Sequence, residues 1–223
     1  MRILLVLAGD PPDFDLIKTE MLIADLVIAV DGGAQSFFVN KLKPDFVIGD
    51  LDSYNDLFDD SVKIIPTDDQ NLTDLQKSLK YVLNIYDPTS LVFLGATGGR
   101  TDHLLNNLHI CASIDHSVQI IFKSTIQVKK SQISETLYRI SAGQEADLSV
   151  TKGASASVLP VIQGATVSVL PVTQFKSLTV EGLLWNINNV DSGSQIVSQS
   201  NIAISDKLMV TLASGCVYIA VYQ

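Results

Sequence analysis

Residues 90–114, SLVFLGATGGRTDHLLNNLHICASI, join a short apolar run to a segment with helical spacing through a loop that contains three glycines. The run SLVFL is almost wholly apolar, which is typical of a strand that is covered on both faces of a sheet. After the loop, Leu104, Leu105, Leu108, Cys111 and Ala112 fall on one stripe of a helix. The stretch therefore predicts a strand, a glycine loop and a helix, which is the repeating unit of a parallel α/β sheet.

The same alternation extends over about the first 125 residues. Apolar runs of similar length recur as ILLVLAG, LVIAVDGG, FVIGD, VKIIPT and VQIIFK. Between two of them, residues 72–86 place Leu75, Leu79, Val82 and Leu83 on one helical stripe. We therefore expect residues 1–125 to form an open, mostly parallel sheet with helices packed on it.

The pattern changes after about residue 141. Helical stripes disappear, and runs rich in Ser, Thr and Val alternate between apolar and polar residues, with Gly or Pro between them. This predicts an antiparallel β-sandwich over residues 141–223. The pentapeptide SVLPV occurs at 157–161 and again at 168–172, which suggests two similar, paired strands. The polar stretch 126–140 is expected to be the crossover linker between the two domains.

The composition excludes several classes of partner. The chain has 223 residues, of which 47% are hydrophobic and 17% charged, and its net charge is −9. No basic block is longer than Lys129–Lys130, so nucleic acid and anionic membranes are poor partners. An acidic protein that binds a phosphate ligand needs local positive charge, which a divalent cation can supply.

The cysteines and the N-terminus favour a cytoplasmic protein. Cys111 and Cys216 lie in apolar contexts, which is typical of buried free thiols in a reducing compartment. The first apolar run has only about six residues before Gly-Asp-Pro-Pro, so it predicts a buried strand rather than a signal peptide. No apolar stretch approaches the roughly 18–20 residues of a membrane span.

Carboxylates follow several of the expected strands. Asp31 ends one run, and Asp50 and Asp52 end the next. Ligands of open α/β sheets bind outside the carboxyl ends of the strands. In an extended chain Asp50 and Asp52 point to the same side and repel each other unless a cation bridges them, and oxygen ligands favour Mg²⁺. Asp68 and Asp69 serve equally well as caps or as part of a site.

The loop GATGGRTDH, residues 95–103, supplies the complement to these carboxylates. Its glycines leave backbone N–H groups free to face an anion at a helix N-terminus, and Arg100 can bind phosphate oxygens through two N–H groups. The lysine of a P-loop is absent, and His103 is more typical of a packing or capping residue than of a base. Together the carboxylates and the loop predict a magnesium–nucleotide site.

Four segments in order resemble the thiamine pyrophosphokinase family: DGGA (31–34), PDFVIGDLDS (44–53), DQNLTDLQKSL (69–79) and GATGGRTDH (95–103). In the second half, GLLWNI (182–187) and SQSN (198–201) resemble the thiamine-binding β-domain of that family. The resemblance implies transfer of pyrophosphate from ATP to the hydroxyl of thiamine, giving thiamine diphosphate and AMP. It also implies a homodimer with thiamine between the two subunits.

The resemblance assigns roles to individual residues. Asp50 and Asp52 are implied as ligands of Mg²⁺. Asp74 is implied as the group that takes or orients the hydroxyl proton, with Asp31 as its rival and Arg100 as a further catalytic residue. The implied ATP-binding residues are Gln70, Thr73, Lys77, Gly98, Gly99, Arg100 and Asp102. The implied thiamine-binding residues are Trp185, which would stack on the rings, and Ser198, Ser200 and Asn201.

Two other functions fit parts of the pattern. A magnesium-dependent nucleotide hydrolase needs the carboxylates and the glycine loop, but it needs neither Trp185 nor a β-domain. A protein that binds thiamine or a nucleotide without turnover needs no catalytic carboxylate, whereas both Asp31 and Asp74 are present. On the residues alone, the sole tryptophan, Trp185, is expected to be a core anchor.

Overall fold

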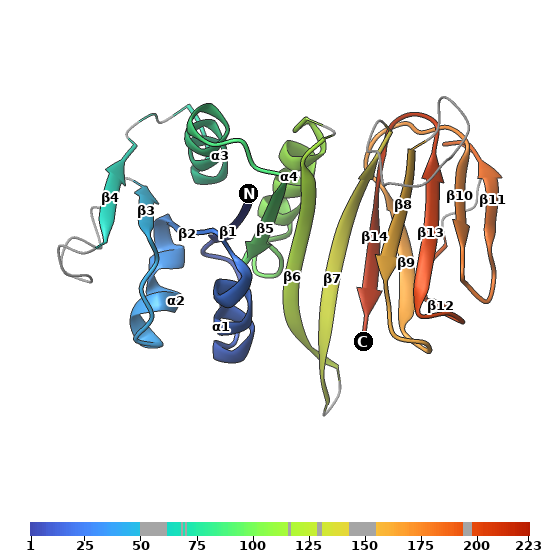
Figure 1. Cartoon of the computed structure of the whole chain (residues 1–223), viewed down its shortest axis with the longest axis horizontal. Coiled ribbons are helices and arrows are strands. Elements are labelled where there is room, and N and C mark those ends of the chain that lie inside the picture. The colour runs from blue at the N-terminus through green and yellow to red at the C-terminus, as the bar shows by residue number, and fades with distance from the viewer. Residues whose placement is uncertain are drawn as a thin grey trace. The chain divides into compact units, whose positions relative to one another are not determined.

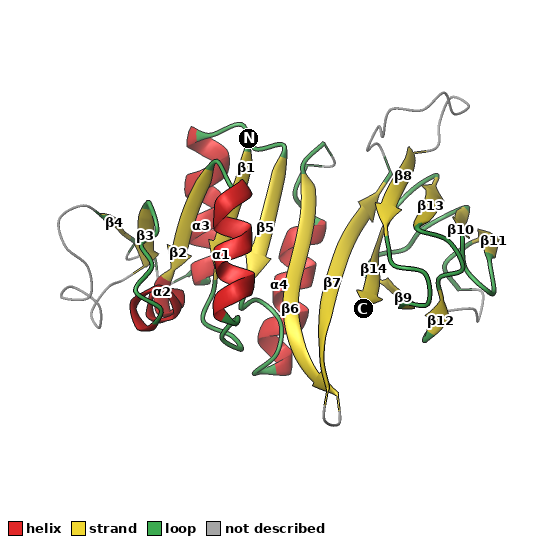
Figure 2. Ribbon diagram, turned by 60° about the horizontal axis from the view of Figure 1, so that its bottom comes forward, coloured by secondary structure: helices red, strands yellow, loops and turns green. Residues whose placement is uncertain are grey.

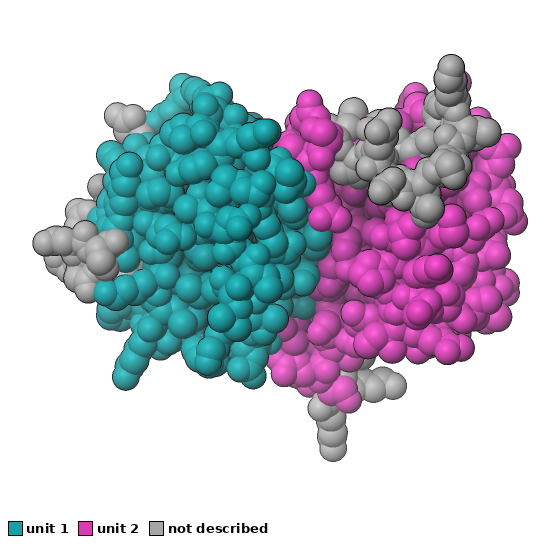
Figure 3. Space-filling model, viewed as in Figure 1, with its two compact units in different colours: residues 1–110, 120–124 teal, residues 111–119, 125–223 magenta. Residues whose placement is uncertain are grey.

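The computed structural model describes residues 1–49, 62–67, 69, 71–115, 117–128, 131–142, 155–193 and 198–223. These residues form two compact units, shown in different colours in Figure 3. Unit 1 comprises Met1–Ile110 and Ile120–Ser124, and unit 2 comprises Cys111–Gln119 and Thr125–Gln223.

The sheet of unit 1 is parallel, with the strand order β5-β1-β2-β3-β4 (Figure 1). The centre of this sheet is shielded from solvent, because every residue of β2 and β5 is buried. In the register of the sheet, Leu4 of β1 lies between Val27 of β2 and Val92 of β5. The strands coincide with the apolar runs of the sequence, which confirms the predicted parallel domain. They are β1 (Arg2–Val6), β2 (Leu26–Val30), β3 (Phe46–Gly49), β4 (Lys63–Pro66) and β5 (Ser90–Leu94).

Helices cover both faces of this sheet: Figure 2 shows α1 on one face and α3 on the other. Helix α3 buries Leu75, Leu79 and Val82, as its apolar stripe predicts, whereas Leu83 is 40% exposed. No helix in the described part of the chain has both the length and the hydropathy that crossing a membrane requires. The helices are α1 (Phe14–Ile23), α2 (Ala34–Val39), α3 (Asp74–Ile85) and α4 (Thr101–Ala112), with a 3₁₀ turn η1 (Asp31–Gly33).

Unit 2 is built from antiparallel strands in two sheets. One sheet has the order β12-β9-β14-β7, and the other has the order β11-β10-β13-β8. Side chains from strands of both sheets, among them Val169, Val210 and Ile219, form one hydrophobic core. This confirms the predicted sandwich. The strands are β7 (Ser131–Ser141), β8 (Ser155–Pro160), β9 (Thr166–Pro171), β10 (Leu178–Glu181), β11 (Ile187–Val190), β12 (Asn201–Ile202), β13 (Lys207–Leu212) and β14 (Cys216–Tyr222).

The stretch expected to be a linker is instead largely strand. Residues 126–128 end β6 (Gln119–Val128), and residues 131–140 belong to β7. The first residues of β7 are exposed and polar, and burial begins only near Thr136. The polar end of a strand does not show the apolar alternation by which strands are recognised, so this part of β7 resembles a linker in the sequence.

The two copies of SVLPV end strands of different sheets. The first copy lies in β8, which pairs with β13, and the second lies in β9, which pairs with β14 and β12. The repeat therefore marks two similar strands, but they do not pair with each other. Each copy places its proline at the last residue of its strand, where a missing N–H costs the sheet least.

One charged side chain lies inside unit 2. Arg139 on β7 is 1% exposed, and its guanidinium donates to the carbonyl oxygens of Cys111 (2.8 Å), Ile114 (2.7 Å), Asp115 (2.9 Å) and Val118 (2.5 Å). These carbonyls belong to the last turn of α4 and the segment after it, and carbonyls at a helix end have no partner within the helix. Burial lowers the pKa of Arg139, and the four carbonyls supply the acceptors that its charge requires.

Candidate active site

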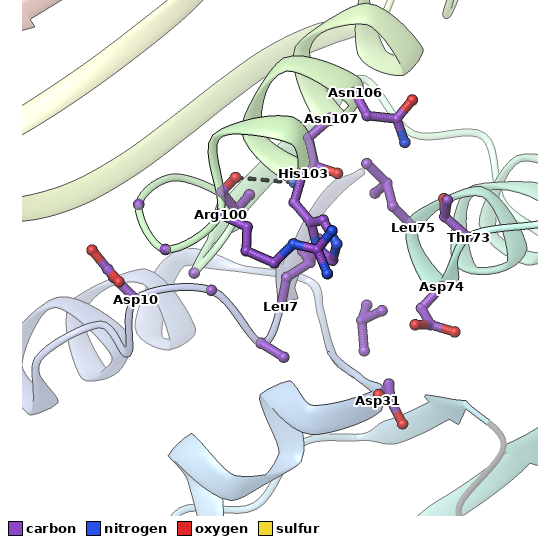
Figure 4. Close-up of a pocket in the computed structure, with 17 residues that line it drawn as sticks. Leu7, Asp10, Asp31, Thr73, Asp74, Leu75, Arg100, His103, Asn106 and Asn107 are labelled. Atoms are coloured by element: carbon purple, nitrogen blue, oxygen red, sulfur yellow. Dashed lines mark hydrogen bonds between the residues drawn. The ribbon is translucent and has the colours of Figure 1, made fainter.

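The candidate active site is a cavity of about 460 Å³ in unit 1. It lies where β1, β2 and β5 end and where α3 and α4 begin, and Figure 4 shows the side chains around it. This is the edge of the sheet at which open α/β proteins bind their ligands. The chain segments that line it are Leu7–Asp10, Val30–Asp31, Thr73–Leu75, residues 95–100 except Thr97, and three residues of α4.

Two loops meet at one side of this cavity. Gly9 N donates to Gly95 O at 2.7 Å, and Asp10 N donates to Thr97 O at 3.4 Å. Gly98 has φ +77°, and a Cβ at this residue would lie 2.0 Å from Asp10 Oδ2. A side chain at residue 98 would therefore clash with Asp10 and would also strain the backbone. A Cβ at Gly99 would lie 3.8 Å from its nearest neighbour, Asp10 Oδ1. Gly99 is therefore the more open of the two predicted phosphate-binding glycines.

Arg100 reaches the cavity while it is held by Asp102. Its Nε donates to Asp102 Oδ1 at 3.0 Å, and a terminal nitrogen donates to Oδ2 at 2.5 Å. This pairing lowers the pKa of Asp102 and raises the pKa of Arg100. A guanidinium has five N–H groups, so three remain for a phosphate. Asp102 is not among the residues that line the cavity, and its contact is with Arg100.

The start of α3 brings Thr73 and Asp74 to the cavity. Thr73 caps the helix: its Oγ1 accepts from Gln76 N at 3.3 Å, and Gln76 Oε1 accepts from Thr73 N at 3.0 Å. Asp74 lies in the first turn, and its Oδ1 accepts from Lys77 Nζ at 3.1 Å. Lys77 is buried and lines a second cavity of about 370 Å³, together with Asp69 and Lys80. Lys77 does not line the first cavity, and its link to the predicted ATP site is the hydrogen bond to Asp74.

Asp31 lies at the end of β2 with φ +44°. A Cβ built on Gly49 would lie 3.1 Å from Asp31 Oδ1, so this carboxylate is packed against the last residue of β3. Figure 4 shows Asp31 and Asp74 on one side of the cavity and Asp10 on the other. Asp50, Asp52, Asp68 and Gln70 lie outside the described residues.

The charges that line the cavity suit a bound cation. Asp10, Asp31 and Asp74 contribute carboxylates, and Arg100 is the one cationic side chain that the described residues place in the lining. Carboxylate oxygens are the ligands that Mg²⁺ prefers. Among the described residues no three His, Cys, Asp or Glu side chains cluster as a metal cage. The donor type at this end of the sheet fits magnesium.

Four polar residues of the cavity were not assigned to it from the sequence. Asp10 follows β1, and His103, Asn106 and Asn107 lie on α4. Asn107 Nδ2 donates to Ala96 O at 3.0 Å and so ties the glycine loop to the helix. His103 is exposed to the cavity rather than packed in a core. The spacing 103, 106 and 107, on the helix face that follows the loop, is the signal that identifies the α4 residues.

The residues with implied thiamine contacts lie together in unit 2. Trp185 is 63% exposed, which excludes the core-anchor interpretation within this unit. Asn201 Nδ2 donates to Trp185 O at 2.7 Å and to Ser198 Oγ at 2.9 Å. Ser200 has φ +54°, and its N donates to Ser168 Oγ at 3.0 Å. The fold thus brings Trp185, Ser198 and Asn201 into one hydrogen-bonded group, with Ser200 beside it.

Two family models match the chain, one in each half. The description "Thiamin pyrophosphokinase, catalytic domain" matches residues 17–122, and "Thiamin pyrophosphokinase, vitamin B1 binding domain" matches residues 149–217. The first match contains Asp31, Asp74 and Arg100, and the second contains Trp185 and Asn201. Together they cover more than half of the 223 residues.

Individual relatives agree with these matches. Thiamine pyrophosphokinase 1 of Oryza sativa is 23% identical over 231 residues, covering 87% of this chain and 78% of the relative. Thiamine pyrophosphokinase from Bacillus subtilis has a similar structure, with a TM-score of 0.75 at 19% identity over 99% of this chain and 98% of the other. The yeast enzyme gives a TM-score of 0.73 at 17% identity, covering 99% and 86%. With both characteristic domains present in order, the chain belongs to the thiamin pyrophosphokinase family.

Proposed function

We propose that this chain transfers the pyrophosphoryl group of ATP to the hydroxyl of thiamine, giving thiamine diphosphate and AMP. The observation that carries the proposal is the cavity of unit 1, where the carboxylates of Asp31 and Asp74 and the guanidinium of Arg100 line one space. Asp31, Asp74 and Arg100 lie within the match to the catalytic domain, and the second match supplies a domain for the acceptor.

The glycine loop and Arg100 form the polyphosphate end of the site. Gly99 has open surroundings, and α4 begins directly after Arg100, so the helix N-terminus favours negative charge there. Arg100 is held by Asp102, which limits its motion before ATP binds. We therefore assign Arg100 to the phosphate oxygens that gain charge during transfer, and Asp102 to holding Arg100 in place.

Asp74 is the group that we assign to the thiamine hydroxyl. Its Oδ1 is bonded to Lys77, so Oδ2 is the oxygen that we assign to the substrate. The carboxylate of Asp74 can accept the hydroxyl proton or hold the hydroxyl in line with the phosphorus. Asp31, packed against Gly49, is better placed to hold a cation at the end of the sheet.

Mg²⁺ is the cofactor that we propose, with Asp31, Asp50 and Asp52 as its ligands. When bound, it would neutralise phosphate charge and orient the transferred group. Among the described residues, Asp31 directly follows β2, which runs beside β3. Asp10 lies away from Asp31, on the other side of the cavity in Figure 4.

We propose that thiamine stacks on Trp185 and that two copies of the chain form a homodimer around it. Trp185, Leu184 and Ile202 are 63%, 50% and 39% exposed, which leaves an apolar surface on unit 2. A flat indole suits the rings of thiamine, and its face attracts the cationic thiazolium. Light scattering of the purified chain across a dilution series measures the dimer directly.

The proposed reaction is tested by a product assay with ATP, Mg²⁺ and thiamine. We expect AMP and thiamine diphosphate in equal amounts, with neither formed when thiamine or the metal is omitted. ATP breakdown without thiamine would instead identify a hydrolase. Saturable thiamine binding without any product would identify a binding protein. Either result would overturn the proposal.

A further inference from the structure

We propose that Asn201 is a positioning residue that fixes the exposed indole of Trp185. The substrate part of this inference rests on the proposed function, because Trp185 is there assigned to thiamine. The positioning part rests on the hydrogen bonds of unit 2 alone.

The side chain of Asn201 binds both backbone polar groups of Trp185. Asn201 Oδ1 accepts from Trp185 N at 3.2 Å, and Asn201 Nδ2 donates to Trp185 O at 2.7 Å. One side-chain amide thus reproduces the paired bonds that a neighbouring strand would make. Such a pair fixes both the position and the orientation of the Trp185 backbone.

The amide of Asn201 has no capacity left for a ligand. Its Nδ2 also donates to Ser198 Oγ at 2.9 Å, and its Oδ1 also accepts from Ile202 N at 2.9 Å. An asparagine amide offers two donors and two acceptor sites, and these bonds fill all four. Asn201 is also only 2% exposed. We therefore infer that Asn201 acts on thiamine through Trp185 rather than through the direct hydrogen bond that the family resemblance implies.

Hydrogen bonds to the backbone of the turn around Trp185 fix the direction in which its side chain leaves the main chain. Leu183 N donates to Asn186 Oδ1 at 3.0 Å, and Leu184 N donates to Ile202 O at 2.8 Å. An indole that is 63% exposed gains little from packing on its own unit. The Asn201 pair, in the middle of this turn, is therefore the contact that holds Trp185 ready for a ligand.

The segment that carries Asn201 is itself held in place. Val169 N donates to Ser198 O at 2.8 Å, and Ser200 N donates to Ser168 Oγ at 3.0 Å. Ser200 has φ +54°, a conformation that a serine adopts only at a cost and that its surroundings must enforce. This local strain turns the chain so that Asn201 faces inward towards Trp185.

The positioning role can be measured without any substrate, because Trp185 is the sole tryptophan of the chain. Its fluorescence anisotropy and its quenching by acrylamide report how firmly the indole is held. We compare the wild type with Asn201→Asp, which keeps the shape but loses both N–H donors, and with Asn201→Ser. The matched control is Asn188→Asp, the same chemical change at an exposed residue of β11.

We expect lower anisotropy and stronger quenching in both Asn201 variants, with the control equal to the wild type. Circular dichroism establishes which variants are folded. If the buried carboxylate of Asn201→Asp prevents folding, Asn201→Ser still decides the matter, because serine is small and neutral. Unchanged anisotropy and quenching in a folded Asn201 variant would overturn the proposal.

Kinetics test the link to the substrate. Losing two backbone bonds should raise the KM for thiamine about tenfold, with the KM for ATP unchanged. In a Trp185→Ala background, Asn201→Ser should add nothing, because two residues that act as one unit are not additive. A further rise in KM in that background would show direct contact and overturn the proposal. If the wild type does not use thiamine, the proposed function is wrong. The fluorescence measurements still decide whether Asn201 positions Trp185, because they use no substrate.

Discussion

Asp10 and Gly98 share one small space at the edge of the cavity, since a Cβ at Gly98 would lie 2.0 Å from Asp10 Oδ2. Gly98→Ala should therefore lose ATP affinity and stability for two reasons, the left-handed backbone and the clash with the carboxylate. The backbone term alone is about 1–2 kcal/mol. Gly99→Ala, with φ +62° and a nearest neighbour 3.8 Å away, should show only that term. Urea unfolding and the KM for ATP measure both variants.

A second substitution separates the two causes. Asp10→Gly should recover part of the loss in Gly98→Ala and nothing in Gly99→Ala, because it removes the clash and leaves the backbone strain. Equal recovery in both backgrounds would mean that Asp10 acts on the loop as a whole.

A substitution of Asp74 tests the proposed reaction. We expect Asp74→Asn to lower kcat about 10²–10⁴-fold, the usual contribution of a general base, and to reduce stability as well, because Asp74 is the ion-pair partner of the buried Lys77. The matched control is Asp87→Asn, an exposed carboxylate beyond the other end of α3. A rate near that of the wild type would transfer the role to Asp31.

At the scale of the element, Thr73 combines two tasks that a substitution can separate. It caps α3 through the reciprocal bonds with Gln76, and it also lines the cavity. Thr73→Ala should cost about 1 kcal/mol of stability and raise the KM for ATP. Thr73→Asp should restore the cap, because aspartate is a good N-cap, but it should not restore ATP binding, because it adds negative charge beside the phosphates. Thermal unfolding and kinetics give the two readouts, and parallel recovery of both would argue that Thr73 acts only through the helix.

The elements were predictable to different degrees, for physical reasons. Strands β1, β2, β3 and β5 of unit 1 are largely buried, so their apolar runs are visible in the sequence, and only the edge strand β4 is mostly exposed among the described strands of this sheet. Strand β7 begins in solvent with polar residues and was therefore expected to be a linker. Leu105 completes an apolar stripe on α4, yet it is 61% exposed, because a periodic pattern shows which face of a helix is buried but not how wide that face is.

The residues of the site were predictable where a functional side chain follows a strand or begins a helix. Asp31, Asp74, Gly99 and Arg100 all line the cavity, as their places after strands or at helix starts indicate. Asp10 was missed, because it lies beside the loop only through the register of β1 and β5. The double contact of Asn201 with Trp185 was likewise beyond the sequence, since 16 residues separate the partners and no local pattern reports the bond.

At the scale of the whole molecule, buried ionisable groups set the response to alkaline pH. Cys111 and Tyr218 are fully buried, and burial raises the pKa of each above its ordinary value. Both stay protonated in the folded chain while their unfolded counterparts lose protons from pH 9 and 10 upward. The stability that the two groups contribute is complete below pH 9. It falls by about 1.4 kcal/mol per pH unit above pH 9 because of Cys111, and by about the same amount again above pH 10 because of Tyr218.

Urea unfolding at several values of pH between 7 and 10.5 measures this decline. Cys111→Ala should show a shallower loss of stability above pH 9 than the wild type, because one titrating group has been removed. Below pH 9 the two curves should run parallel. Parallel curves over the whole range would mean that Cys111 also ionises in the folded chain. Both free cysteines are buried, so native protein at pH 8 should also resist alkylation.

The guanidinium of Arg139 has a consequence for how such chains evolve. The carbonyls that it satisfies lie at residues 111–118, inside the match to the catalytic domain, whereas Arg139 lies in the stretch between residues 122 and 149, which neither family model matches. A gene fusion that joined this catalytic half to a foreign β-domain would bury those carbonyls without a donor unless the newcomer carried an arginine at the same register. We therefore expect residue 139 and the segment 111–118 to change together in evolution.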